Sequence, residues 1–272
     1  MKIDKSIRTK LQSYETIEER LNFLKGMFEG DTAYLISCGP TLTQHDKEIL
    51  NKKLKKKLVL CAKQSLNYFN DICDFHLVST YNFQPYEYKN PNTIKSWQLT
   101  GMNMENELNR IVNEYKHEID LYFPVISGPW ITLEGSTAYT RNFDNWKMLG
   151  EKTQVMWGPG ILYESGFPLC HLLGVSKIVT IGWDIGDLSK YEGNERDDDW
   201  FNQHSVDLYK DGSYTGKGPS YTELKNTIDC TSAMYDWFEK ENIEVNILSV
   251  TNPADKRFKR NKCGGFINGN NI

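Results

Sequence analysis

The stretch Ala33–Leu42, AYLISCGPTL, decides the fold class of this chain. Its first half, Ala33–Ser37, is a short apolar run, which predicts a strand buried on both faces of a parallel sheet. Gly39 and Pro40 then form a turn, and the polar segment 43–54 has helical character. A strand, a tight turn and a helix place backbone N–H groups where they can bind a phosphate. The alternative is an ordinary strand-to-helix turn of an α/β protein.

Further apolar runs follow, separated by segments of helical character. The predicted strands are 58–62, 75–79, 94–99, 154–157, 177–182 and 244–249. This alternation favours an α/β fold, a Rossmann-like and mostly parallel sheet flanked by helices. We expect a helical lead-in over 1–30, a single domain over 31–250, and a basic, flexible tail over 251–272. The segments 123–150 and 185–219 are predicted to be lid-like loop insertions in that domain.

Composition narrows the class of protein. The chain has 272 residues, a net charge of -4, 39% hydrophobic and 25% charged residues, as expected of a globular protein without a nucleic-acid partner. We find no signal-peptide pattern and no apolar run of membrane-spanning length. The six cysteines contain no CxxC pair, which predicts reduced thiols, no zinc site and a cytoplasmic location. The lysines of 52–57 and 256–262 leave open a peripheral contact with the inner face of a membrane.

Few residues outside the turn carry obvious chemistry. Asp184 and Asp187 follow a predicted strand, where open α/β sheets bind ligands. The acids of 197–199 could hold a divalent cation, or they could be solvated. His204 could act as a general base, or it could be an incidental loop histidine. Tyr214, beside a glycine-rich segment, has a hydroxyl that can donate to a leaving phosphate.

The order of these features resembles a known family. The turn Cys-Gly-Pro-Thr-Leu after the first strand, a second strand with a cysteine, and the later LGVSKIVTIGWD are similar to bacterial lipooligosaccharide sialyltransferases of the Campylobacter type. The same order resembles a related family that includes motility-associated glycosyltransferase factors and hydroxymethylpterin diphosphokinases. The likeness covers about 31–249, and its specific motifs are two short stretches.

The resemblance implies a set of site residues. Those implied to bind the nucleotide are Cys38, Gly39, Pro40, Thr41, Lys63 and Gln64, together with Ser165 and Gly166, or alternatively Gly158 and Gly160, near the cytidine monophosphate of the donor. Those assigned to catalysis are Asp184, His204 and Tyr214. The chain departs from the family pattern, because Cys38 and Lys63 stand where the family has asparagine. The family's general-base histidine, just before the last helix, has no equivalent here, and His204 lies earlier.

Three functions are therefore open. The first is an inverting glycosyltransferase that transfers a sugar from a CMP-activated or similar nucleotide-sugar donor to a glycan acceptor, without a cofactor or a metal. The second is a Mg²⁺-dependent diphosphokinase, with the ion held by Asp184, Asp187 or the acids of 197–199. The third is a non-catalytic protein that binds a nucleotide or a sugar. A homo-oligomer is compatible with each.

Overall fold

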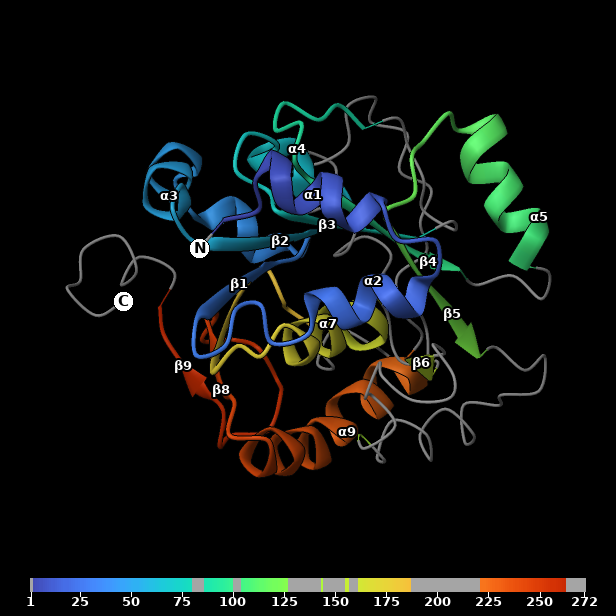
Figure 1. Cartoon of the computed structure of the whole chain (residues 1–272). Coiled ribbons are helices and arrows are strands. Elements are labelled where there is room, and N and C mark those ends of the chain that lie inside the picture. Colours follow the sequence, from blue (N-terminus) through green and yellow to red (C-terminus); the bar gives the residue numbers. More distant parts are fainter. Residues whose placement is uncertain are drawn as a thin grey trace.

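The chain has an α/β fold, in which helices cover both faces of one β-sheet (Figure 1). The computed structural model describes residues 2–79, 86–99, 104–126, 143, 155–156, 161–186 and 221–262. Its sheet has nine strands in the order β6-β5-β4-β3-β2-β1-β7-β8-β9. The strands are β1 Thr32–Ile36, β2 Leu58–Ala62, β3 Phe75–Ser79, β4 Ile94–Leu99, β5 Leu121–Ile126, β6 Val155–Met156, β7 Lys177–Ile181, β8 Glu244–Ile247 and β9 Lys259–Arg260.

Every pairing between the described strands is parallel, which confirms the predicted fold class. All strands therefore end at one edge of the sheet, which we call the carboxyl edge, and begin at the opposite amino edge. From β1 the chain builds the sheet outward through β2 to β6, then returns to add β7, β8 and β9 on the other side of β1. The strand order thus reverses between β1 and β7, and such a switch point is where open α/β sheets bind ligands.

Helices bury both faces of the sheet. The α-helices are α1 Lys5–Gln12, α2 Ile17–Leu24, α3 Lys47–Leu54, α4 Leu66–Phe69, α5 Met104–Asn109, α7 Phe167–Leu172 and α9 Tyr221–Lys240. Short 3-10 turns are η1 Pro40–Gln44 and η2 Lys63–Ser65, and π-helical turns are η4 Arg110–Glu114 and η6 Leu162–Gly166.

Successive side chains of one strand enter different cores, because they point to opposite faces. Leu35 packs in a core with residues of α1, α2, α7 and α9, whereas Ile36 packs with residues of α3 and α4. Figure 1 shows α7 and α9 on one side of the sheet and α3 and α4 on the other. This two-sided burial explains why the strands are apolar runs.

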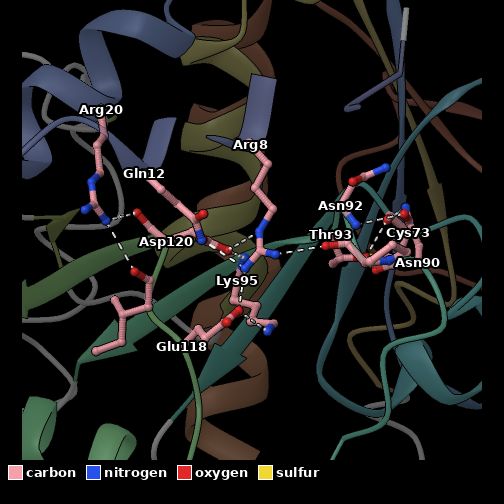
Figure 2. Close-up of polar contacts among 12 residues, drawn as sticks. Arg8, Gln12, Arg20, Cys73, Asn90, Asn92, Thr93, Lys95, Glu118 and Asp120 are labelled. Carbon is pink, nitrogen blue, oxygen red and sulfur yellow. Dashed lines mark hydrogen bonds and ion pairs between the residues drawn. The ribbon is translucent and has the colours of Figure 1, made fainter. Parts of the chain in front are cut away.

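The amino-terminal helices are tied to the amino edge through a buried carboxylate (Figure 2). Asp120, which directly precedes β5, is fully buried and accepts hydrogen bonds from Arg8 Nε at 3.2 Å and Gln12 Nε2 at 2.7 Å. Arg20 of α2 donates to the backbone carbonyl of Asp120 at 2.8 Å. A buried carboxylate needs such donors, so this acid fixes α1 and α2 against the sheet.

Part of the predicted insertion belongs to the sheet. Residues 123–126 lie in β5, which pairs with both β4 and β6. The prediction of a loop is therefore wrong for these residues, because their backbone pairs with strands on both sides. Apart from Phe143 and β6, residues 127–160 lie outside the described part of the chain, and so do residues 187–219 of the second predicted insertion.

The tail is also folded where the structure describes it, up to residue 262. Phe258 is only 3% exposed, and β9 pairs with β8. Arg260 donates to the backbone carbonyls of Phe258 at 2.9 Å and Asn252 at 3.2 Å, and also to that of Ala254. The prediction of a flexible tail is wrong for residues 251–262, because this guanidinium organises the backbone around itself.

Within the described part of the chain, no helix combines the length and apolar character needed to cross a membrane.

Candidate functional site

Two loops meet at the switch point between β1 and β7. Ser37 N–H donates to the Ile181 carbonyl at 2.8 Å, and Gly39 N–H donates to the Gly182 carbonyl at 2.9 Å. A Cβ atom on Gly39 would lie 2.5 Å from Oδ2 of Asp184. Gly39 has an ordinary φ of -70°, so this position needs glycine for space rather than for its backbone conformation. The loop after β1 is thus packed directly against the loop after β7.

Asp184 binds the turn after β1, which the sequence predicts as a possible phosphate-binding turn. Its Oδ2 accepts from the Thr41 N–H at 2.7 Å, and its Oδ1 accepts from the Thr41 hydroxyl at 2.5 Å. Both residues are buried, with Asp184 only 9% exposed. A carboxylate at the start of a helical turn satisfies N–H groups that have no partner inside the turn. The Thr41 N–H group is therefore already bound to Asp184 and is not open to a phosphate.

Lys63 lies at the end of β2, beside the end of β1. Its ammonium acts on the Cys38 thiol: burial raises the pKa of that thiol, and the charge of Lys63 partly offsets the rise. Asp184 also acts on Cys38 and raises its pKa. Cys38 and Lys63 follow neighbouring strands at the carboxyl edge, and the charges of Lys63 and Asp184 both act on the Cys38 thiol.

The backbone of Lys63 is unusual. Its φ is +51°, a left-handed conformation that side chains other than glycine rarely adopt. The Lys63 carbonyl contacts Nε2 of His76 at 2.9 Å, and Nδ1 of His76 contacts the Tyr88 hydroxyl at 2.7 Å. The His76 ring also meets the ring of Tyr86 edge-on, with centroids 4.5 Å apart.

Gln64 follows Lys63 and is only 1% exposed. Among the described residues, its Oε1 has no hydrogen-bond donor. A buried acceptor without a donor costs about 1–3 kcal/mol, so such an atom at the carboxyl edge is an expected place for a ligand N–H or O–H group.

Ser165 and Gly166 have protein surroundings that explain them without a ligand. Ser165 is 1% exposed and donates its hydroxyl to the Ile161 carbonyl at 2.9 Å. A Cβ atom on Gly166 would lie 3.3 Å from side-chain carbons of Leu35 and of Leu77, so this glycine lets η6 approach the sheet closely. Their assignment to nucleotide binding stays a prediction.

Several predicted residues lie outside the described part of the chain. These are Gly158, Gly160, Asp187, the acids of 197–199, His204 and Tyr214. For Pro40, the structure describes only the backbone, as the first residue of η1. Within the described part of the chain, no group of three or more His, Cys, Asp or Glu side chains is arranged to hold a metal ion.

His76, Tyr86 and Tyr88 were not among the residues predicted from the sequence. His76 stands in the strand FHLVS, and its polar side chain inside an apolar run is the signal that could have found it. Tyr86 and Tyr88 lie in a polar stretch without strand or helix periodicity, and nothing local connects them to the loop after β2.

The chain resembles two glycosyltransferases of known structure at low sequence identity. No protein-family model and no curated protein sequence matches the chain. The chain is structurally similar to the MAf glycosyltransferase from Magnetospirillum magneticum AMB-1, with 10% identity and a TM-score of 0.48. That match covers 92% of this chain and 39% of the MAf chain, so this chain spans well under half the length of that protein.

The chain also resembles the sialyltransferase CstII from Campylobacter jejuni. The structure of CstII with cytidine-5'-monophosphate matches at 11% identity and a TM-score of 0.42, covering 90% of this chain and 89% of CstII. The structure with CMP-3FNeuAc matches at 12% identity and a TM-score of 0.37, covering 80% and 79%.

Proposed function

We propose that this chain is a nucleotide-sugar-dependent glycosyltransferase, with its donor site at the carboxyl edge between β1 and β7. The observation that carries the proposal is the group formed by Cys38 after β1 and by Lys63 and Gln64 after the neighbouring strand β2, next to the switch point of a parallel sheet. It combines a cation, a buried acceptor without a described donor, and a neutral thiol. A ligand with a negative phosphate and at least one N–H or O–H donor, such as a nucleotide, complements this group.

In the proposed reaction, the acceptor hydroxyl attacks the anomeric carbon of the donor sugar. The bond from that carbon to the phosphate oxygen breaks, and its electron pair leaves with the nucleotide. The ammonium of Lys63 stabilises the negative charge that develops on the departing phosphate. We assign the acceptor's proton to His204, which lies in the segment that the structure does not describe.

We do not assign that proton to Asp184. Both of its carboxylate oxygens already accept hydrogen bonds from Thr41. A base must be able to receive the proton of the substrate, and the hydrogen bonds from Thr41 already occupy both oxygens that would receive it. Asp184 in this proposal positions the turn beside the donor.

The lysine cluster of 52–57 bears on how the acceptor arrives. Lys57 directly precedes β2 and Lys63 directly follows it, so the cluster lies at the amino edge and the proposed site at the carboxyl edge. A strand of this length spans about 17 Å. A membrane contact through this cluster would direct the site away from the lipid surface, so we propose that the glycan acceptor approaches from the solvent.

A thermal-shift panel tests the donor class, because a ligand that binds only the native state raises the melting temperature. The panel is CMP, CDP, UDP, GDP, AMP and ATP, each with and without Mg²⁺. CMP is included because CstII was solved with it. Stabilisation by a pyrimidine or guanine nucleotide without metal supports the proposal, and release of that nucleotide from its sugar conjugate would establish turnover.

Two other outcomes point elsewhere. Stabilisation by ATP only with Mg²⁺ would favour the diphosphokinase. Binding of a nucleotide without turnover of any sugar conjugate would favour a non-catalytic binding protein. No stabilisation by any member of the panel would contradict the proposal.

A further inference from the structure

The loop after β2 leaves the sheet through a strained residue. The ladder between β2 and β3 runs to the pair Ala62 and Leu77, and Lys63 then turns away with its φ of +51°. A residue other than glycine keeps this conformation only where its surroundings hold it. Lysine has no local side-chain bond that favours it, unlike asparagine or aspartate.

His76 supplies the contact that holds this turn. It lies on β3 opposite Cys61, so its side chain reaches diagonally past the end of the ladder to the Lys63 carbonyl, 2.9 Å from Nε2. A carbonyl oxygen only accepts, so Nε2 of His76 carries the proton. Burial lowers the pKa of His76 to about 3, which keeps the ring neutral, and Nδ1 is then an acceptor for the Tyr88 hydroxyl.

The imidazole is thus fixed from both sides. The Lys63 carbonyl determines the tautomer, Tyr88 donates to the other ring nitrogen, and the ring of Tyr86 packs edge-on against the imidazole. A ring fixed in this way presents one N–H group to one carbonyl, and such a hydrogen bond from a histidine fixes both the tautomer and the orientation of the ring.

We infer that His76 is a positioning residue for the donor site: its Nε2–H holds the Lys63 backbone in the left-handed conformation and so directs the Lys63 side chain from the end of β2, beside the end of β1. This inference rests on the proposed function for the identity of what the ammonium binds. The placement of Lys63 by His76 is a separate statement and can be tested without a ligand.

Two substitutions at position 76 separate positioning from packing. The amide nitrogen of glutamine can occupy the place of Nε2, so His76→Gln keeps a donor for the Lys63 carbonyl. His76→Asn places its amide near Nδ1 and loses that donor. We expect His76→Asn to weaken CMP binding about tenfold, measured by calorimetric titration, and His76→Gln to stay within about threefold of the wild type. The matched control is His171→Asn, which removes the partly buried contact between His171 Nε2 and the Glu241 carboxylate. This variant should leave the CMP affinity unchanged.

A stability cycle gives the ligand-free test. The folding equilibrium constant is measured by urea unfolding for His76→Asn, Lys63→Gly and the double variant. Glycine adopts the left-handed conformation without help. We therefore expect the factor by which His76→Asn lowers the folding equilibrium constant to be about tenfold smaller when residue 63 is glycine.

The outcomes test two claims separately: that His76 positions Lys63, and that the protein binds a nucleotide. Equal losses of CMP affinity in His76→Asn and His76→Gln, or additive effects in the stability cycle, would overturn the inference. Wild-type affinity in His76→Asn, with loss of binding in Lys63→Gln, would also overturn it. If wild-type protein binds no nucleotide, the proposed function fails, and the stability cycle alone decides whether His76 positions Lys63.

Discussion

Thr41 and Asp184 lie 143 residues apart in the sequence, yet the backbone N–H and the hydroxyl of Thr41 bind the two carboxylate oxygens of Asp184. This pair joins the loop after β1 to the loop after β7 at the point where the strand order reverses. We call this pair the brace, because it fixes the turn Cys38–Thr41 at the carboxyl edge and occupies the Thr41 N–H that a phosphate would otherwise bind.

The brace predicts a coupled loss of stability. Asp184→Ala should lower the free energy of unfolding by about 2–3 kcal/mol, because it removes two bonds to a charged acceptor and leaves a buried N–H without a partner. Thr41→Val should cost about 1–2 kcal/mol alone and much less in the Asp184→Ala background. Asp46→Ala, which removes the exposed N-cap of α3, is the control and should not couple to Thr41. Urea unfolding of the variants measures these values, and additive costs for Thr41 and Asp184 would refute the brace.

Gly39→Ala should be strongly destabilising, because the new methyl group would lie 2.5 Å from Asp184 Oδ2 and closer still to the Gly182 carbonyl. We expect a loss of at least about 2 kcal/mol in unfolding free energy. Gly26→Ala is the comparison: its Cβ would meet nothing within 4 Å, so only the cost of its φ of +69° remains, about 1 kcal/mol. An equal or smaller loss for Gly39→Ala would show that the two loops can separate freely.

Lys63→Gly should stabilise the protein while harming its function. Relief of the left-handed conformation is worth about 1 kcal/mol, and the ammonium is lost with the side chain. Lys57→Gly, at the other end of β2 and without a positive φ, should instead lose up to about 1 kcal/mol. Unfolding curves that shift the two variants in the same direction would contradict a strained Lys63.

Stability should fall in mild acid because of His76. The unfolded histidine binds a proton below pH 6.5, whereas burial keeps the folded ring neutral down to about pH 3. The unfolded state therefore holds more protons in that window, and the unfolding free energy falls as the pH is lowered, by about 1.4 kcal/mol per pH unit for this residue. His117, with a pKa of about 4, adds a similar slope over part of the window. Between pH 6 and 5, His76→Gln should be less steep than wild type by about that amount, and equal slopes would be inconsistent with a buried neutral His76.

The sheet could be predicted because each central strand is buried on both faces. Leu58–Ala62 and Phe75–Ser79 are strands over the residues that the apolar runs predict. The lead-in predicted as one helical segment is two helices, because Thr16 and Glu19 form a capping box that starts α2. The edge strand β9 has two residues and no apolar run, so pattern alone could not find it.

The site could be predicted only in part. Glycine, cysteine and lysine after successive strands indicate the carboxyl edge, and in the structure Cys38 and Lys63 follow the neighbouring strands β1 and β2. The sequence cannot show that Asp184 binds Thr41, because partners 143 residues apart leave no local pattern. It places Gly39 in a turn, but it cannot show that Asp184 and the Gly182 carbonyl leave no room there for any side chain.

The most direct measurement is a calorimetric titration of CMP, without metal, into wild-type protein, Lys63→Gln and Lys57→Gln. The two variants make the same chemical change at opposite ends of β2. The account predicts binding to the wild type, affinity reduced about tenfold to a hundredfold in Lys63→Gln, and wild-type affinity in Lys57→Gln. Equal affinities in all three proteins, or no binding to the wild type, would contradict a nucleotide site at the carboxyl edge.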